Sequence, residues 1–81
     1  MTKIFTAIVN DINDTAMAFT SREKAVEFCK EQLVELMEEM GKASIYIEAE
    51  VQNMDDAFAE DDFFTSRIVD SKFFINELEL A

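Results

Sequence analysis

The sequence predicts an α+β domain in which a small antiparallel sheet of about four strands packs on one long amphipathic helix, with a second short helix. Two observations support this class: one long segment has apolar residues at helical spacing, and several shorter runs are rich in apolar and β-branched residues. The chain of 81 residues contains a single glycine, no proline and no linker-like stretch, so residues 1–81 form one domain. At 49% hydrophobic residues, with eight phenylalanines, it has enough apolar side chains to fold.

The first two predicted strands form a hairpin. Residues 3–9 are apolar on both faces, which favours a central position in the sheet. Residues 10–14 contain two Asn and two Asp, which are typical of turns. Residues 15–19 then form a short second strand paired with the first.

The clearest predicted element is a helix over residues 21–40. Thr20 and Glu23 are spaced as a capping box at its start, and Gly41 is placed to end it in a left-handed conformation. One apolar stripe recurs at three- and four-residue spacing along it, made of Ala25, Val26, Cys29, Leu33, Leu36, Met37 and Met40.

Residues 44–51 alternate between apolar and polar, which predicts a half-buried antiparallel strand. Its apolar face holds Ile45, Ile47, Ala49 and Val51, and its solvent-exposed face holds Ser44, Tyr46, Glu48 and Glu50.

The segment from residue 53 onward allows two arrangements. In the first, Asn53 caps a short helix over 54–62, and residues 67–69 pair with 73–80 as a hairpin across 70–72. In the second, one helix runs to about residue 69 and is followed by a single last strand. In either case, adjacent phenylalanines at 63–64 and 73–74 cannot all face one core, so at least one lies exposed.

Acidity is the main functional signal. Eighteen Asp and Glu oppose seven Lys and Arg, for a net charge of −11, whereas solubility requires a magnitude of only about 2–8. Such a surface repels nucleic acid and anionic membranes, so the predicted partner is a basic protein, with no direct nucleic-acid or membrane binding. The candidate partner-binding residues are Glu27, Glu31, Glu35, Glu38, Glu39, Glu48, Glu50, Asp55, Asp56, Glu60, Asp61 and Asp62.

The predicted helix carries acidic residues in positions that lower its own stability. Glutamates four residues apart repel one another, and from Glu31 to Met40 no side chain is positive, although the helix dipole favours cations there. Such a departure from the stability optimum is expected at a functional surface.

The residues expected of an enzyme are missing. The sequence has no histidine, one cysteine and no glycine-rich loop, so it offers no common general base, zinc pattern or phosphate cradle. The acidic run over 55–62 lacks the glycine and the spacing of a calcium loop. Cys29 lies on the apolar stripe and is interpreted as a small buried hydrophobe. We therefore expect a non-enzyme without metal or cofactor.

Location and assembly are also suggested by the sequence. A single cysteine, no secretory leader and no long apolar run predict a cytoplasmic protein. Homodimerisation would add buried area to a thin core.

The acidic helix, the acidic run and the missing catalytic residues together resemble small acidic phage-encoded inhibitors of host defence, including DNA-mimic anti-restriction and anti-CRISPR proteins. The resemblance is one of overall character, without a diagnostic motif, and residues 19–25 resemble the strand-to-helix junction of many short phage proteins. It implies that carboxylates stand in for phosphates and occupy the basic groove of a nuclease, restriction enzyme or CRISPR effector. The alternative function is a general interaction module, antitoxin-like or an adaptor, that binds through Tyr46 and exposed phenylalanines.

Overall fold

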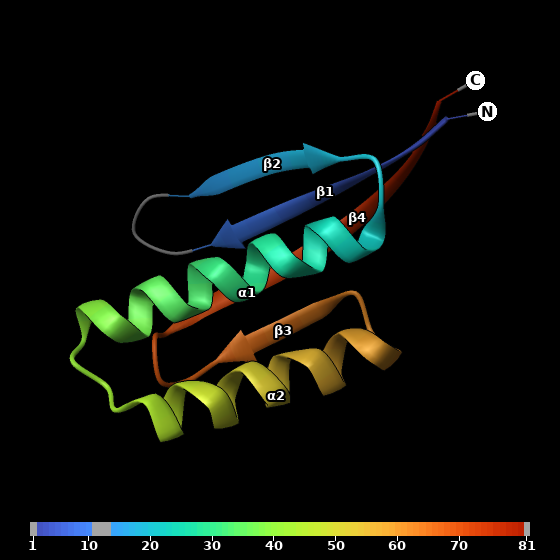
Figure 1. Ribbon diagram of the computed structural model, residues 1–81. Helices are drawn as coiled ribbons and strands as arrows, with labels where there is room; N and C mark the ends of the chain where they lie inside the picture. Colours follow the sequence, from blue (N-terminus) through green and yellow to red (C-terminus); the bar gives the residue numbers. More distant parts are fainter. Residues whose placement is uncertain (1, 11–13, 81) are drawn as a thin grey trace.

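The computed structural model describes residues 2–10 and 14–80 and has the predicted α+β class. The elements in chain order are β1 (Thr2–Asn10), β2 (Thr15–Phe19), α1 (Arg22–Glu39), α2 (Ser44–Glu60), β3 (Phe63–Ser66) and β4 (Ser71–Leu80). The four strands form one sheet in the order β2-β1-β4-β3, with every neighbouring pair antiparallel. Both helices lie side by side on the same face of this sheet (Figure 1).

The predicted central strand and its hairpin are confirmed. β1 lies between β2 and β4, with Ala7 opposite Met17 on one side and opposite Ile75 on the other. Residues 11–13 of the predicted turn lie outside the described residues. Apolar residues on both faces of β1 therefore marked an inner strand correctly.

The first helix is confirmed, but its predicted capping box is wrong. The N-cap is Ser21, whose Oγ accepts from the backbone N–H of Lys24 at 3.2 Å. Because the helix starts one residue later than the box requires, Glu23 cannot reach back to the cap. At the other end, Gly41 (φ +73°) donates to the carbonyl of Glu38 and Lys42 donates to that of Met37, which is a Schellman motif.

Residues 44–51, predicted as a strand, are instead the first half of α2. The side chain of Ile45 is 70% exposed, whereas that of Glu50 is only 7% exposed, the reverse of the alternating pattern. The buried face of α2 holds residues four apart, Glu50, Met54 and Phe58, with Ile47 and Val51 packed beside them. This stripe continues across residue 53, so Asn53 lies inside the helix and caps nothing, and the second helix is 17 residues long rather than short.

The last hairpin is present with a different first strand. Residues 67–70, which include the predicted strand 67–69, form the turn, and β3 at Phe63–Ser66 pairs with β4. Asp70 adopts a positive φ of 52°, a conformation that Asp tolerates better than most residues. The alternative of one helix reaching residue 69 is wrong. Phe63 is 54% exposed, as expected for one member of an adjacent phenylalanine pair.

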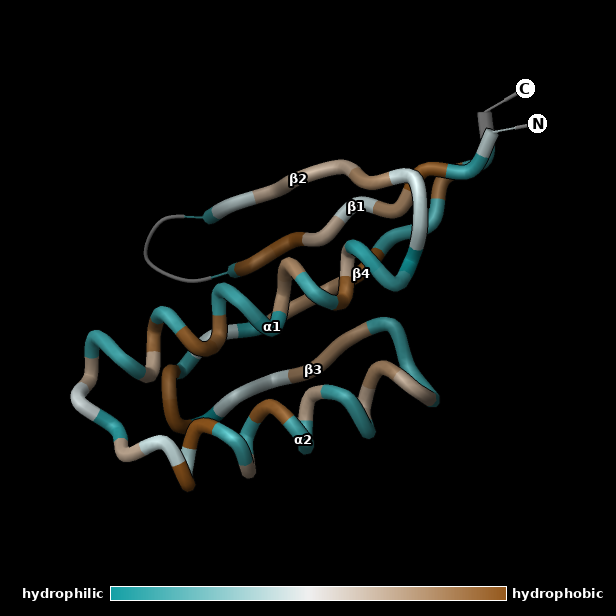
Figure 2. Tube along the Cα trace, viewed as in Figure 1, coloured by the Kyte–Doolittle hydropathy of each residue, from teal (hydrophilic) through white to brown (hydrophobic). Residues whose placement is uncertain are grey.

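The core lies between the sheet and the two helices. Its buried members come from β1, β4 and both helices: Ala7, Val9, Ala25, Cys29, Leu33, Met37, Met54, Phe58, Phe73 and Ile75. Hydrophilic segments recur along both helices, whereas the strands are more apolar (Figure 2). The other face of the sheet carries no helix, so the molecule has two layers.

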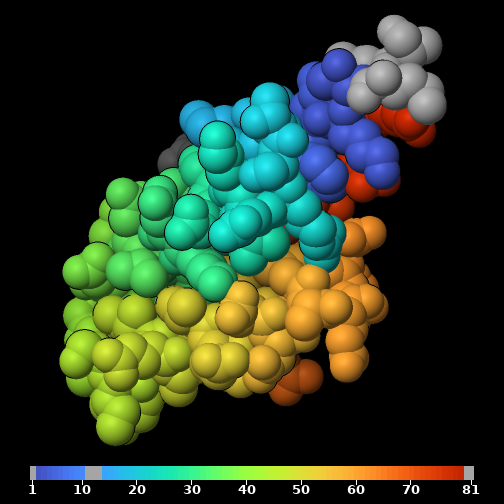
Figure 3. Space-filling view, turned by 45° about the vertical axis from the view of Figure 1, so that its right-hand side comes forward, coloured from blue at the N-terminus to red at the C-terminus, as the bar shows by residue number. Residues whose placement is uncertain are grey.

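One end of the sheet projects from the body. Beyond the Phe5–Phe19 pair, β1 has no partner in β2, and residues 2–4 pair only with 78–80 of β4. This two-stranded arm extends away from the helices, which helps to explain the elongated dimensions of 44 × 25 × 16 Å (Figure 3).

Candidate functional site

Negative charge is concentrated in the helical layer. Residues 21–62 contain thirteen of the eighteen carboxylates and four of the seven cations, so this segment has a net charge of −9 out of −11. The segment consists of α1, α2 and their flanking turns, which lie on one face of the sheet (Figure 1). The fold therefore gathers most of the charge on one side of the molecule.

The outer side of α1 carries the most regular series of carboxylates. Because Ala25, Cys29, Leu33 and Met37 point into the core, the glutamates on the opposite side are exposed. Successive members four residues apart rise about 6 Å along the helix axis. The exposed series consists of Glu27, Glu31, Glu35 and Glu39, with Glu38 exposed beside it.

The second helix adds carboxylates next to this series. α2 runs antiparallel to α1 (Figure 1). A groove of about 530 Å³ between the helices is lined by carboxylates of both, Glu23, Glu27, Asp55 and Asp56, and by the cations Arg22 and Lys30. Glu48 and Glu60 are exposed elsewhere on α2, and Asp61 and Asp62 are exposed just after it. Eleven of the twelve predicted site residues are thus exposed on or beside the two helices.

Few of these carboxylates are neutralised within the molecule. In the described residues, only two of the twelve form ion pairs: Asp55 with Lys30 at 2.8 Å, and Asp62 with Arg22 at 2.7 Å. Asp56 also accepts a hydrogen bond from Gln52 at 3.0 Å. Most of the charge on the helical layer therefore remains available to an external cation.

Glu50 does not belong to the exposed surface, which corrects its predicted role. One carboxylate oxygen accepts from the Asn53 amide at 2.9 Å and the other from the Ser66 hydroxyl at 2.8 Å. Glu48 is exposed as predicted, but it lies on a helix and not on the open face of the sheet. The incorrect strand assignment explains both differences.

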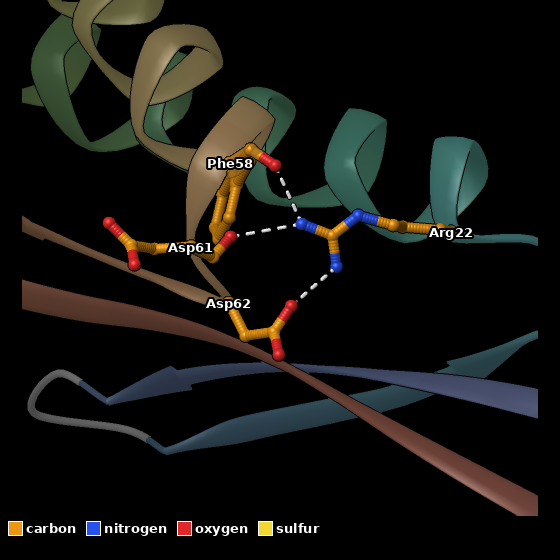
Figure 4. A network of polar contacts seen from close by, with 4 residues as sticks. All are labelled: Arg22, Phe58, Asp61 and Asp62. Atoms are coloured by element: carbon orange, nitrogen blue, oxygen red, sulfur yellow. Dashed lines mark hydrogen bonds and ion pairs between the residues drawn. The ribbon is translucent and has the colours of Figure 1, made fainter.

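Arg22 is a structural residue of this surface that the sequence interpretation missed. From the first turn of α1, one guanidinium nitrogen donates to the carbonyls of Phe58 (2.6 Å) and Asp61 (2.9 Å), and the other pairs with Asp62 (Figure 4). It thereby satisfies backbone carbonyls at the end of α2, where the helix dipole also favours a cation. Its place in the sequence, beside Lys24 at the start of α1, gave no sign that it would reach the end of α2.

Cys29 is fully buried, and its burial raises the pKa of the thiol to about 12, so it stays protonated at neutral pH. Within residues 2–10 and 14–80, no group of three or more Cys, Asp or Glu side chains is arranged to hold a metal ion. None of the described helices combines the length and apolar character needed to cross a membrane.

Comparisons with protein-family models, with curated proteins and with solved structures find no match for this chain.

Proposed function

We propose that this chain is a non-catalytic inhibitor whose helical layer binds the basic nucleic-acid-binding surface of another protein. The target class is a nuclease, a restriction enzyme or a CRISPR effector of a host cell, met in the cytoplasm. The carboxylates of α1 and α2 take the places that phosphates occupy in the natural ligand. The observation that carries this proposal is the segregation of nine net negative charges onto two adjacent helices and their flanking turns.

Electrostatics favours this kind of target over a neutral one. A dense field of one sign speeds the encounter with an oppositely charged surface and makes binding sensitive to salt. Surfaces that hold nucleic acid are rich in Lys and Arg because they neutralise phosphates. A rigid pair of helices holds its carboxylates in place before binding, which lowers the entropic cost of association.

A charge-matched pair of variants tests the location of the binding surface. The first variant changes Glu27, Glu31, Glu35 and Glu38 of α1 to Gln. The second changes four carboxylates outside the helical layer: Asp14 and Asp70 to Asn, and Glu77 and Glu79 to Gln. Both variants have a net charge of −7, so any difference between them reports position and not total charge.

The experiment begins with capture of proteins from a bacterial lysate on the immobilised wild-type chain at low salt, followed by elution with a salt step. The captured protein is identified, and its affinity for the wild type and both variants is then measured by displacement of a labelled DNA duplex. The α1 variant should bind about tenfold more weakly or worse, whereas the second variant should bind nearly as the wild type does. Equal weakening in both variants, or a target that binds no nucleic acid, would refute the proposal.

The second candidate function is an interaction module that uses exposed apolar side chains. Tyr46 (62% exposed) and Ile45 (70% exposed) lie at the start of α2. Tyr46 and Ile68 line a groove of about 500 Å³ there. Binding through this patch would change little with salt and would be lost in Tyr46→Ala.

A further inference from the structure

The sheet face that carries no helix is an uncovered apolar surface. Residues of β1 with odd numbers point into the core, so Ile4, Thr6 and Ile8 point the other way. The register extends this face across the neighbouring strands, through Ala16 and Ala18 of β2, Phe63 and Thr65 of β3, and Phe74, Asn76 and Leu78 of β4. Phe63 and Leu78 are 54% and 57% exposed on it.

The side chains on this open face change in size from one edge to the other. The register aligns Ala16, Ile8, Phe74 and Phe63 in one row across β2, β1, β4 and β3. The β2 edge is therefore shallow and the β3 edge is raised. Two such sheets fit face to face when one is turned over, because the raised β3 edge of each copy then lies against the shallow β2 edge of the other.

Charge distribution indicates which partner this face can accept. Thr2, Asn10 and Lys72 also point to this face. Among the residues named on it, Lys72 is the only charged one. Two copies of a chain with a net charge of −11 repel each other most strongly through their helical layers. The open face is where two copies can approach while their helical layers stay farthest apart.

We propose that the open face binds a second copy of this chain, sheet against sheet, around a two-fold axis that runs along the strands between β1 and β4. Phe63 of each copy then lies over Ala16 and Ala18 of the other, Ile8 lies over Phe74, and Ile4 lies over Leu78. Sheets stacked in this way lie about 10 Å apart. The two acidic helical layers face outward in opposite directions, so each copy keeps its helical layer free.

The size of the face suits a dimer of moderate affinity. Four strands about 4.8 Å apart and about seven residues long cover roughly 450 Å² as a flat area, and the accessible surface of the side chains on it is larger. Two such faces approach the lower end of specific interfaces, about 1,200 Å² in total. We expect dissociation in the micromolar range rather than a permanent dimer.

Sedimentation equilibrium of the full chain from about 1 to 500 μM tests the assembly. The 9.3 kDa chain should approach twice that mass as concentration rises, and added NaCl should strengthen the dimer because it screens the repulsion. Phe63→Lys should abolish association, whereas Ile45→Lys, which replaces an exposed apolar residue of the helical layer, should not. A chain that stays monomeric throughout, or one that Ile45→Lys dissociates and Phe63→Lys does not, would overturn the proposal.

Disulfide trapping tests the geometry without a disruptive charge. Ala16→Cys and Phe63→Cys place thiols on opposite edges of the sheet, three strand spacings or about 14 Å apart within one copy, too far for an intrachain disulfide. A mixture of the two single variants should form a mixed disulfide dimer under mild oxidation, faster than either variant alone. Cys29 is buried and serves as an unreactive internal reference. Trapping no faster in the mixture than in either single variant contradicts the proposed axis.

Discussion

At the scale of single residues, Glu50 shows how one carboxylate in an acidic protein can serve the fold. It joins α2 to the β3–β4 hairpin through Ser66, which is 1% exposed and also accepts from the backbone N–H of Val69 at 3.4 Å. Burying a carboxylate is costly unless hydrogen bonds replace its water, and both of its oxygens have a partner here.

Replacing Glu50 should therefore destabilise the protein, although the change removes a negative charge. Glu50→Ala leaves the buried Ser66 hydroxyl without its acceptor, and we expect a loss of about 1–3 kcal/mol in the free energy of unfolding. Glu48→Ala, which removes an exposed carboxylate from the same helix, should change it by less than about 0.5 kcal/mol. Urea denaturation at neutral pH measures both, and equal midpoints would contradict the structural role of Glu50.

Cys29 makes stability depend on pH in the alkaline range. Its pKa rises from 9.0 in the unfolded chain to about 12 in the folded protein because the thiol is buried. Below pH 9 the thiol is protonated in both states; between pH 9 and 12 the unfolded state loses the proton and the folded state keeps it. The free energy of unfolding should therefore fall by up to about 1.4 kcal/mol for each pH unit in this range.

The variant Cys29→Ala isolates this contribution from other groups that titrate at alkaline pH. Thermal or urea unfolding at pH 8 and pH 11 should show a smaller loss of stability for the variant than for the wild type. Parallel losses would show that the thiol of Cys29 does not contribute.

At the scale of elements, α1 was predictable and α2 was not. Two signals identify α1, a continuous apolar stripe and Gly41 at the C-terminus, whereas the predicted N-cap lay one residue too early. In α2, the alternation of residues 44–51 imitates a strand because Ile45 is an apolar residue left exposed and Glu50 is a charged residue that is buried. Both exceptions depend on tertiary contacts, which periodicity alone does not contain.

Arg22 is the contact that joins the two helices at the end where α2 stops. Arg22→Ala removes hydrogen bonds to the carbonyls of Phe58 and Asp61 and the ion pair with Asp62. Because its side chain is 37% exposed, we expect a loss of about 1–2 kcal/mol, at the lower part of the range for charged hydrogen bonds. The control Lys24→Ala removes a neighbouring exposed cation of α1, and a similar loss there would attribute the effect to net charge.

At the scale of the whole molecule, charge opposes folding. Carboxylates crowded on the helical layer repel one another, so the free energy of unfolding should rise by about 1 kcal/mol or more between 20 mM and 500 mM NaCl. The variant with four glutamines on α1 should gain less from salt, because part of the repulsion is already removed. Urea denaturation at the two salt concentrations measures the difference, and equal gains would place the repulsion elsewhere.

Sequence reasoning was most successful for properties that depend on composition and local pattern. The α+β class, the central strand 3–9, the hairpin with 15–19 and the exposure of one phenylalanine at 63–64 all follow from residues close together in the chain. The gathering of charge on one layer could not be derived, since it depends on residues 44–60 being helical and lying beside α1. The open apolar face of the sheet was missed for the same reason.

The sheet topology also has a consequence for folding kinetics. The two central strands, β1 and β4, are the first and last elements, and their pairing brings Thr2 opposite Leu80 and Asn10 opposite Lys72. The β1–β2 hairpin and the two helices can form locally, but the centre of the sheet must close a loop of about sixty residues. Contacts so distant in sequence slow the search for the native state. This small protein, rich in helix, should therefore fold more slowly than a helical bundle of the same length.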